Sequence, residues 1–138
     1  LTSNGTNIQV YQGNGTDSQK FRFEKIEFST LEDGIYTINS SLDNNKVISI
    51  NNSVASNMSS IQLSTNNNEN NQKWYIKNLG NDVYSITSII NQNRALDVEW
   101  GIAANKTSIW LYNSNDTLSQ KWYIKYVGNG YYSIIIWI

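Results

Sequence analysis

The chain contains no cysteine, no histidine and no proline. Without cysteine it has no disulfide framework, no thiolate nucleophile and no thiolate ligand for a metal ion. Without histidine it lacks the side chain that most often acts as a general base near neutral pH. The carboxylate pairs Glu32 with Asp33, and Asp43 with Asp97, do not have a spacing typical of acid–base catalysis. We therefore expect no catalytic residue, no metal site and no cofactor.

Charge and hydropathy argue against two further kinds of partner. Ten basic and eleven acidic residues give a net charge of −1, and neither sign is clustered, so binding to nucleic acid or to an anionic membrane surface is not expected. No run of 18 apolar residues occurs, and the first residues show no basic, apolar export signal, so no membrane insertion is expected. A chain of 138 residues is long enough for a single domain, residues 1–138, with its own core.

Three short elements recur along the chain with one period. The stretches "DSQKFRF", "NNQKWYI" and "LSQKWYI" contain Gln19, Gln72 and Gln120. A Tyr-x-Ile element begins at Tyr36, Tyr84 and Tyr132, in two equal steps, and the step from Gln72 to Gln120 has the same length. An apolar-x-apolar pair begins at Ile8, Ile61 and Ile109, in the same two steps as the glutamines. The first of these steps is longer, and its extra residues lie between Gln19 and Tyr36, which predicts a longer loop there.

Each repeat consists of short segments that alternate apolar and polar residues and are separated by Asn, Gly and Ser clusters. This pattern predicts β-strands and turns, with at most a helical turn or two. A unit of four short strands cannot bury its own apolar face, so the copies must pack around a common axis. We expect an all-β, threefold barrel with repeat segments of about 1–32, 33–80 and 81–128, and residues 129–138 opening a further copy.

Alternation also predicts which side chains fill the core. On the last strand of each repeat, residues two apart share a face, whereas Lys73, Tyr75 and Lys77 point the other way. The expected core residues on these strands are Phe21 and Phe23, Trp74 and Ile76, and Trp122 and Ile124.

Gln-x-Trp at this period, together with "LDV" at residues 96–98, resembles the ricin-type β-trefoil lectins, which are also catalogued as a carbohydrate-binding module family. The resemblance covers nearly the whole chain, and its cysteine-free, Asn-rich style is similar to that of clostridial haemagglutinin components. It implies a β-trefoil fold and a galactose-type pocket in each repeat. Such a pocket combines the Asp of Leu-Asp-Val, an aromatic residue about fifteen positions on, and polar groups just before Gln-x-Trp.

The third repeat matches this pocket best. The resemblance makes Asp97 the acceptor for sugar hydroxyls, and because Leu96 and Val98 face the other side, we expect its carboxylate on the exposed face of the strand. Tyr112, further along the chain, takes the position of the stacking aromatic. A pyranose has one face of C–H bonds that stacks on an aromatic ring, and edge hydroxyls from which a carboxylate accepts hydrogen bonds. Such a shallow site binds weakly, on the order of millimolar.

Four more residues complete the predicted third-repeat site. Gln120, from the Gln-x-Trp element, is expected to orient Asp97 or the sugar. Ser119 stands where this family usually has Asn, so hydroxyl recognition is expected to be weaker or mediated by water. Trp110 and Trp100 either add an aromatic wall to the pocket or serve the fold.

The second repeat lacks both key side chains of this pocket. Ser49 and Ser64 stand where Asp97 and Tyr112 stand one period later. Asn71 remains before the Gln-x-Trp element. Without an acid and a ring we expect no sugar binding in this repeat.

The first repeat is interrupted by the start of the chain. By the period, residue 138 corresponds to residue 90 and residue 1 to residue 102, so the piece equivalent to residues 91–101, which holds Leu-Asp-Val, is missing. The sequence therefore resembles a phase-shifted β-trefoil whose start lies within the first repeat, and a piece of a longer chain. Its second, incomplete site consists of Gln9, Tyr11, Ser18 and Gln19 and lacks an acid. We expect it to bind only if residues outside this sequence complete it.

The leading functional prediction is a secreted, non-catalytic module that binds glycans with terminal galactose or N-acetylgalactosamine and targets an attached toxin or glycan-degrading enzyme. One alternative is a trefoil that has lost sugar binding and serves as a protein-assembly or inhibitory surface, through Trp100, Trp110 and Trp137. A second alternative is a xylan-binding module of a bacterial hydrolase.

Overall fold

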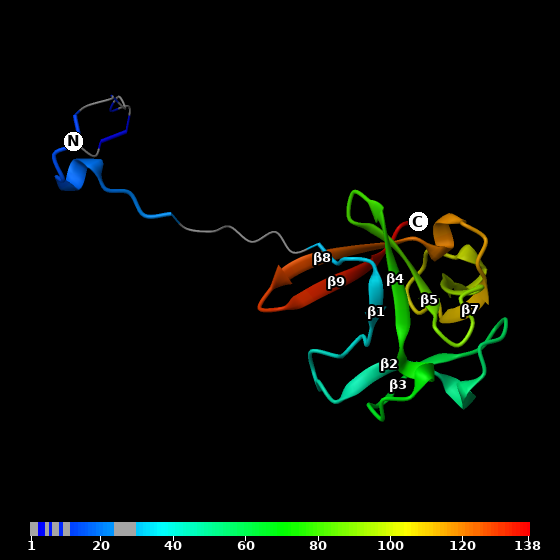
Figure 1. Ribbon diagram of the computed structural model, residues 1–138. Helices are drawn as coiled ribbons and strands as arrows, with labels where there is room; N and C mark the ends of the chain where they lie inside the picture. Colours follow the sequence, from blue (N-terminus) through cyan, green and yellow to red (C-terminus); the bar gives the residue numbers. More distant parts are fainter. Residues whose placement is uncertain (1–2, 5, 7–8, 10–11, 24–29) are drawn as a thin grey trace.

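Strands separated by short turns make up the chain from residue 34 onward (Figure 1), as the alternation predicts. The computed structural model describes residues 3–4, 6, 9, 12–23 and 30–138. The strands are β1 (Gly34–Tyr36), β2 (Lys46–Ile50), β3 (Ile61–Thr65), β4 (Trp74–Gly80), β5 (Val83–Ser88), β6 (Arg94–Val98), β7 (Ile109–Asn113), β8 (Trp122–Gly128) and β9 (Tyr131–Ile136). The 3-10 turns are η1 (Asp17–Gln19), η2 (Asn51–Ser53), η3 (Asn70–Gln72), η4 (Glu99–Gly101) and η5 (Leu118–Gln120).

Two copies of one four-strand unit follow each other along the chain. In the first unit β1 pairs with β4, and β2 pairs with β3 as a separate antiparallel hairpin. In the second unit β5 pairs with β8 and β6 with β7, so the same pairing recurs one period later. The units are joined by the β4–β5 pair, and the β8–β9 pair starts a third unit in the same way. The period found in the sequence is therefore a period of strand pairing.

Short hairpin turns join the paired strands of successive units. Asn81 and Asp82 connect β4 to β5, and both have positive φ, at 54° and 62°. Asn129 and Gly130 connect β8 to β9 with φ of 54° and 81°. Two-residue hairpin turns of this type need a left-handed backbone, with positive φ, at both positions. Asn, Asp and Gly adopt this conformation at little cost. The Asn-rich clusters in the sequence thus determine where the strands reverse.

Trp74 and Trp122 lie at the centre of the core, as predicted. They are 0% and 5% exposed, and Ile76 and Ile124, two residues further along their strands, are also buried. Each indole N–H donates to a backbone carbonyl 26 residues earlier, that of Ile48 at 3.0 Å for Trp74 and that of Leu96 at 3.3 Å for Trp122. A buried Trp therefore fills the space between a unit's strands without leaving its N–H unpaired.

Three equivalent tyrosines open the successive units. Tyr84 is buried, and its hydroxyl accepts a hydrogen bond from the N–H of Leu31 at 3.2 Å. The Tyr36 hydroxyl donates to the carbonyl of Glu32 at 2.7 Å. Burial raises the pKa of Tyr36, and the charge of Glu32 raises it further. Tyr132 packs against the core from β9.

The prediction that Phe21 and Phe23 belong to the core is wrong for the described structure. Phe21 is 70% and Phe23 95% exposed, and residues 12–23 lie apart from the strands in Figure 1. Local alternation marks these positions correctly as the equivalents of Trp74 and Ile76, but a side chain is buried only where a partner strand covers it.

Among the residues that the structure describes, the helical segments are three-residue turns, and no helix has the length and apolar character needed to cross a membrane.

Candidate functional site

Asp97 lies near the end of β6 and is buried, with 6% of its surface exposed. The prediction that its carboxylate emerges on an exposed face is therefore wrong. Leu96 and Val98 are buried as well, so both faces of this strand end are covered. The reason is the pairing of β6 with β7, which places Trp110 directly opposite Asp97.

Both oxygens of the Asp97 carboxylate accept hydrogen bonds from buried donors. Oδ1 accepts the indole N–H of Trp110 at 3.0 Å, and Oδ2 accepts Nε2 of Gln120 at 2.8 Å. The hydroxyl of Ser119 reaches Oδ2 at a longer 3.5 Å. A charged acceptor held by two N–H donors is a strong arrangement. The carboxylate thus holds the side chains of Trp110 and Gln120 in place at this end of the unit.

Trp110 is 8% exposed and does not form an open wall of the pocket. Its ring instead fills the space next to Asp97 and links the acid to two other aromatics. Tyr112, two residues further along β7, stacks on it with ring centroids 5.8 Å apart. Trp100 meets it edge-on at 5.0 Å from the turn η4. We call Trp100, Trp110 and Tyr112 the aromatic row.

Trp100 is the exposed member of the aromatic row, at 67% exposure. Its φ of 53° is left-handed, which costs a bulky residue roughly 1–2 kcal/mol. The equivalent residue of the first unit, Asn52 in η2, has the same conformation with φ of 64°, and Asn tolerates it far better. A strained backbone that holds a large ring at the surface lowers the stability of the fold. Backbone strain of this kind is common at functional sites.

The side chain of Gln120 hydrogen-bonds both to Asp97 and to the loop that precedes Gln120 in the chain. Its Nε2 donates to the carbonyl of Asn113 at 2.8 Å, and its Oε1 accepts the N–H of Asn115 at 2.9 Å. The expectation that Gln120 orients Asp97 agrees with this geometry. The turn η5, which contains Gln120, lies against both β6 and η4, so the loop is held beside Trp100.

The other two repeat glutamines make the same pair of hydrogen bonds to the loops that precede them. Each side-chain amide donates to the carbonyl seven residues earlier and accepts the N–H five residues earlier. For Gln72 the partners are Thr65, at 2.8 Å, and Asn67, at 2.9 Å. For Gln19 they are Gln12 and Asn14, both at 2.8 Å. The glutamine of this element is therefore a structural residue in all three repeats, and among the described residues only Gln120 also donates to an acid, Asp97.

The loop that carries Ser119 is internally hydrogen-bonded. Oδ1 of Asn115 accepts the N–H of Thr117 at 3.1 Å and its hydroxyl at 2.8 Å. The Thr117 hydroxyl in turn lies 2.8 Å from that of Ser119. Ser119 is half-buried, and this chain of contacts fixes where its hydroxyl stands relative to Asp97.

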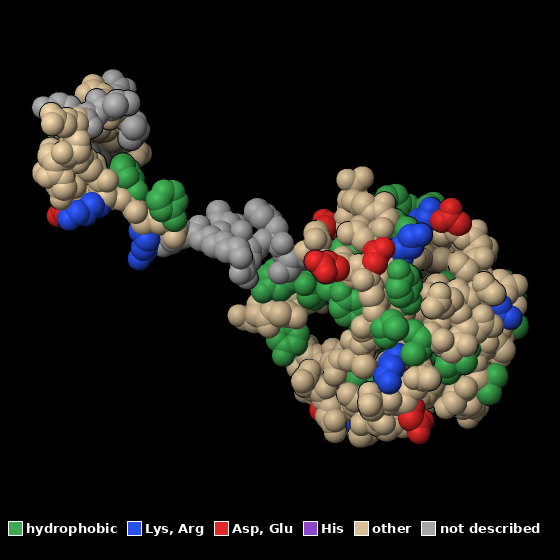
Figure 2. Space-filling view, in the orientation of Figure 1, with side chains coloured by type: hydrophobic (Ala, Val, Ile, Leu, Met, Phe, Trp, Pro, Cys, Tyr) green, Lys and Arg blue, Asp and Glu red, His purple; other side chains and the backbone are tan. Residues whose placement is uncertain are grey.

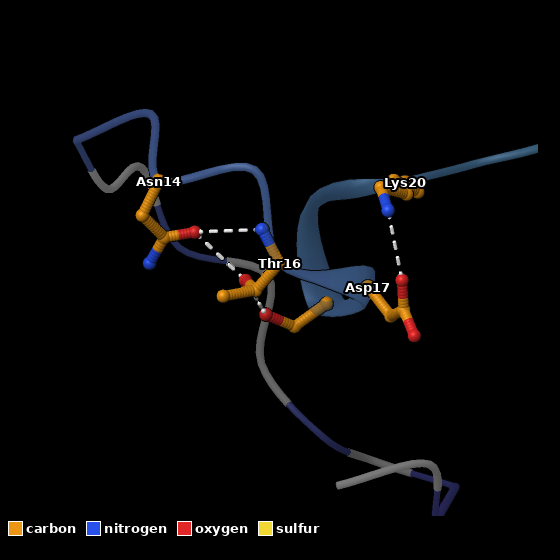
Figure 3. Close-up of polar contacts among 5 residues, drawn as sticks. Asn14, Thr16, Asp17 and Lys20 are labelled. Atoms are coloured by element: carbon orange, nitrogen blue, oxygen red, sulfur yellow. Dashed lines mark hydrogen bonds and ion pairs between the residues drawn. The ribbon is translucent and has the colours of Figure 1, made fainter.

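Figure 3 shows the same loop in the first repeat. Oδ1 of Asn14 accepts the N–H of Thr16 at 3.1 Å and its hydroxyl at 2.7 Å, and the Thr16 hydroxyl lies 2.9 Å from that of Ser18. Asp17 and Lys20 form an exposed ion pair at 3.0 Å across the turn η1. The loop geometry is thus a local property of the sequence, reproduced in two repeats.

Of the predicted first-repeat site, Gln9 and Ser18 are exposed, Gln19 is half-buried within its loop, and Tyr11 lies outside the described residues. Ser18 corresponds to Ser119, but the neighbouring acid, Asp17, pairs with Lys20, and the hydroxyl of Ser18 contacts that of Thr16. Whether this site binds a ligand stays a prediction.

In the second repeat two hydroxyls occupy the position of the acid and the ring. Ser49 and Ser64 are hydrogen-bonded to each other at 2.5 Å, and Nε2 of Gln72 donates to Ser64 at 3.3 Å. Gln62 stands opposite Ser49, at the position of Trp110, and is exposed. Aromatic side chains of the third-repeat kind are absent from these positions.

Sequence reasoning did not identify Trp110 as a hydrogen-bond donor to Asp97. The register of the β6–β7 hairpin would have identified this hydrogen bond, because it places the two residues opposite each other.

Taken together, this end of the unit offers an exposed indole, a half-buried phenol, a hydroxyl and a buried carboxylate. Such a set can stack on an apolar face and contact a few hydroxyls. Over the described part of the chain, no group of three or more His, Cys, Asp or Glu residues could hold a metal ion.

Comparison with known proteins relates the whole arrangement to one family. The family model for "Ricin-type beta-trefoil lectin domain-like" proteins matches residues 17–112 and 70–136. Flavastacin from Elizabethkingia meningoseptica is 36% identical over 81 residues, which cover 59% of this chain and 17% of flavastacin. The chain thus spans under a fifth of that relative's length.

Two solved structures show the same fold. ThreeFoil, a designed threefold-symmetric protein, aligns with a TM-score of 0.71 and 23% identity over 76% of this chain and 74% of its own. The exo-beta-1,3-galactanase 1,3Gal43A from Clostridium thermocellum aligns with a TM-score of 0.67 and 26% identity, over 76% of this chain and 22% of its own. The all-β, threefold fold is therefore a β-trefoil, as predicted.

Proposed function

Because this chain belongs to the ricin-type beta-trefoil lectin domain-like family, we propose that it is a carbohydrate-binding module whose sugar site is the aromatic row beside Asp97. The observation that carries the proposal is Trp100, an indole 67% exposed, held in a left-handed backbone and packed against the ring that bonds the acid. An exposed, immobilised ring is the platform on which the C–H face of a sugar stacks.

In this proposal the ligand meets the rings first and the acid last. The sugar face lies on Trp100, with Tyr112 at its side. One edge hydroxyl contacts Ser119 and, through the long Ser119 contact to Oδ2, the Asp97 carboxylate. Since each carboxylate oxygen already accepts a bond from an N–H donor, the acid recognises fewer hydroxyls than an open carboxylate does. Affinity is on the order of millimolar, and useful strength requires several sites.

We infer that the sugar is galactose or N-acetylgalactosamine. The similarity to a galactanase supports this class, although the shared module covers only 22% of that enzyme. We further propose that the chain is a non-catalytic targeting module of a larger extracellular protein, such as a toxin or a glycan-degrading enzyme. The partial coverage of flavastacin and the galactanase supports a modular context.

The alternative of a protein-assembly surface relied on three exposed tryptophans, and the structure removes one of them. Trp110 is buried. Trp137 stacks on Tyr123 at 4.8 Å and remains 37% exposed. The two tryptophans that remain exposed, Trp100 and Trp137, pack on different rings, Trp110 and Tyr123, whereas a protein interface favours one contiguous aromatic patch.

A titration followed by NMR tests the proposal. The chain has five tryptophans, and each gives an indole N–H signal. Adding galactose or N-acetylgalactosamine to tens of millimolar should shift the signals of Trp100 and Trp110 and leave that of buried Trp74 unchanged. Glucose and xylo-oligosaccharide serve as comparison ligands. A response to xylo-oligosaccharide alone would assign the site to xylan, and no response to any sugar would contradict carbohydrate binding.

Replacing Tyr112 with alanine should weaken sugar binding several-fold and lower the free energy of unfolding by about 1 kcal/mol, because the half-buried ring stacks on Trp110. Denaturant unfolding measures the effect, with Tyr112→Phe as the matched control. The phenylalanine variant keeps the stacking and should be as stable as the parent. Equal losses for both variants would show that the hydroxyl, and not the ring, stabilises the row.

A further inference from the structure

A cleft apart from the aromatic row lies between the β4–β5 hairpin and the loop that leads into η5 and β8. Its volume of about 350 Å³ is that of a site for a small molecule. One wall is the outer face of the hairpin, and the other includes Ser114, Asp116, Gln120 and Lys121. Among the described residues, none of the three rings of the aromatic row lines this cleft. It is therefore separate from the surface on which the proposed sugar stacks.

The pairing of β4 with β5 builds the hairpin wall of the cleft. Tyr75 lies opposite Thr87, and Lys77 lies opposite Ser85. All four side chains line the cleft, because residues two apart on a strand share a face. Ile76, between two of them, is buried in the core. The wall thus carries a phenol ring, an ammonium group and two hydroxyls on neighbouring residue pairs.

Lys77 brings a positive charge without a counter-ion to the cleft. It is exposed and, over the described part of the chain, it forms no ion pair. Lys125, its equivalent one period later, lies over the ring of Tyr123 at 5.3 Å from the centroid. The ammonium group of Lys125 is therefore engaged by a ring of its own hairpin, whereas that of Lys77 is available to an anionic ligand.

The opposite wall adds a second lysine and a carboxylate. Nζ of Lys121 lies 3.3 Å from Oδ1 of Asp116, and the two side chains are 25% and 88% exposed. An ion pair with one exposed partner contributes little stability, so Asp116 can turn to accept a ligand hydroxyl. Two lysines and one aspartate among the lining residues give a net positive charge. Figure 2 shows basic and acidic side chains close together on this side of the molecule, over the upper part of β4 and the turn η5.

We propose that this cleft is a second binding site and that its ligand is an acidic sugar, a pyranose that carries a carboxylate. The carboxylate pairs with the ammonium group of Lys77, and the C–H face of the ring lies on Tyr75. The ring hydroxyls bond Ser85, Thr87 and Asp116. A small inorganic anion would use the lysine alone, and a neutral sugar would leave the ammonium group without a partner. This site goes beyond the proposed function, because it takes a different ligand through residues outside the aromatic row.

Galactose and galacturonate are a matched pair of ligands for the test, since they differ only at C6, where a carboxylate replaces the hydroxymethyl group. In an NMR titration of the whole chain at low salt, galacturonate should shift the backbone amide signals of Lys77 and Thr87. It should bind there about three- to fivefold more tightly than galactose, which is the effect of one exposed charge pair. Equal binding of both sugars at these signals, or no response to galacturonate, would overturn the proposal.

The salt dependence of the same titration gives a second readout. Because Lys77 is exposed, its attraction for the carboxylate is screened by counter-ions, and at about 0.5 M salt the preference for galacturonate over galactose should largely disappear. A preference that is unaffected by salt would show that the carboxylate does not pair with an exposed lysine, and it would overturn this assignment.

A pair of lysine variants assigns the charge to one position. Lys77→Gln removes the charge and keeps most of the side chain, so the affinity for galacturonate should fall to that for galactose. Lys125→Gln makes the same change at the equivalent position of the β8–β9 hairpin and should bind galacturonate as the parent does. An equal loss in both variants would mean that the net charge of the protein attracts the ligand, and the cleft would then not be a site.

The aromatic row is tested separately from this cleft. Trp100→Asn should leave the galacturonate-induced shifts of Lys77 and Thr87 unchanged, even where it abolishes the response to galactose. If galacturonate shifts only the indole signals of Trp100 and Trp110, the acidic sugar binds at the aromatic row and the second site is refuted. If neutral sugars fail to bind while galacturonate still shifts Lys77, the proposed function fails and the second site stands.

Discussion

Replacing Asp97 with alanine lowers the free energy of unfolding by about 2–4 kcal/mol, because it leaves two buried donors without an acceptor. The indole N–H of Trp110 and Nε2 of Gln120 both point at the carboxylate, and the site is closed to solvent. A buried donor that loses its partner costs about 1–3 kcal/mol. The ring of Trp110 also loses its anchor, so sugar binding should disappear together with stability.

Denaturant unfolding measures this loss, and the second repeat offers a matched control. Ser49 occupies the same position one period earlier and is also buried, but its hydroxyl bonds that of Ser64. Ser49→Ala should cost about 1 kcal/mol or less, since the hydroxyl of Ser64 can rotate to another partner. Similar losses at both positions would mean that Asp97 contributes only ordinary packing.

The isosteric variant Asp97→Asn separates charge from shape. Asparagine has one oxygen and one amide nitrogen, so it can accept from Trp110 or from Gln120 but not from both. The Gln120 amide cannot turn over, because Asn113 and Asn115 hold both of its ends. We expect a loss of roughly 1–2 kcal/mol, between those of the parent and the alanine variant. A variant as stable as the parent would contradict the hydrogen-bonding scheme.

Replacing Trp100 with asparagine should abolish detectable sugar binding, a loss of at least about tenfold, or about 1.4 kcal/mol, in affinity. The exposed indole is the proposed stacking surface, and nothing else in the aromatic row has comparable exposure. Stability should be unchanged or rise by up to about 1 kcal/mol, because asparagine accepts the left-handed backbone of η4 more easily than tryptophan. The NMR titration and thermal unfolding measure the two effects on one sample.

The reciprocal variant tests whether a ring alone makes a site. Asn52→Trp places an indole in the equivalent left-handed position of η2. No acid lies beneath it, since Ser49 stands there, so the variant should gain no sugar binding and should lose stability. Undiminished binding by Trp100→Asn would show that the sugar does not stack on this ring, whatever the reciprocal variant does.

Much of the fold follows from local pattern. Trp74 and Trp122 are buried because alternation along their strands gives them one face and the repeat gives both the same surroundings. The left-handed turns at Asn81 and Asn129 also follow from local chemistry, because the residues that tolerate positive φ stand where the strands reverse. Phe21 and Phe23 carry the same pattern and are nevertheless exposed in the described structure, since alternation specifies a face and not the partner that covers it.

For the candidate site, the residues were predictable and their roles were not. The spacing of Asp97, Tyr112 and Gln120 is visible in the sequence, and Gln120 does hold the acid. The carboxylate was expected in solvent, yet Trp110 covers it from the opposite strand. That cover depends on the register of the β6–β7 hairpin and on the size of one side chain, which no single strand encodes.

By itself the amino-acid sequence determined the threefold period, the strand faces, the turns and the residues that distinguish the third repeat from the second, because these depend on residues close together in the chain. Only the tertiary structure decided that Asp97 is buried and hydrogen-bonded, that Trp110 is one of its donors and that Trp100 is the exposed member of the aromatic row. Burial and hydrogen bonding of a side chain depend on what arrives from distant segments, so they are settled when the units pack together and not before.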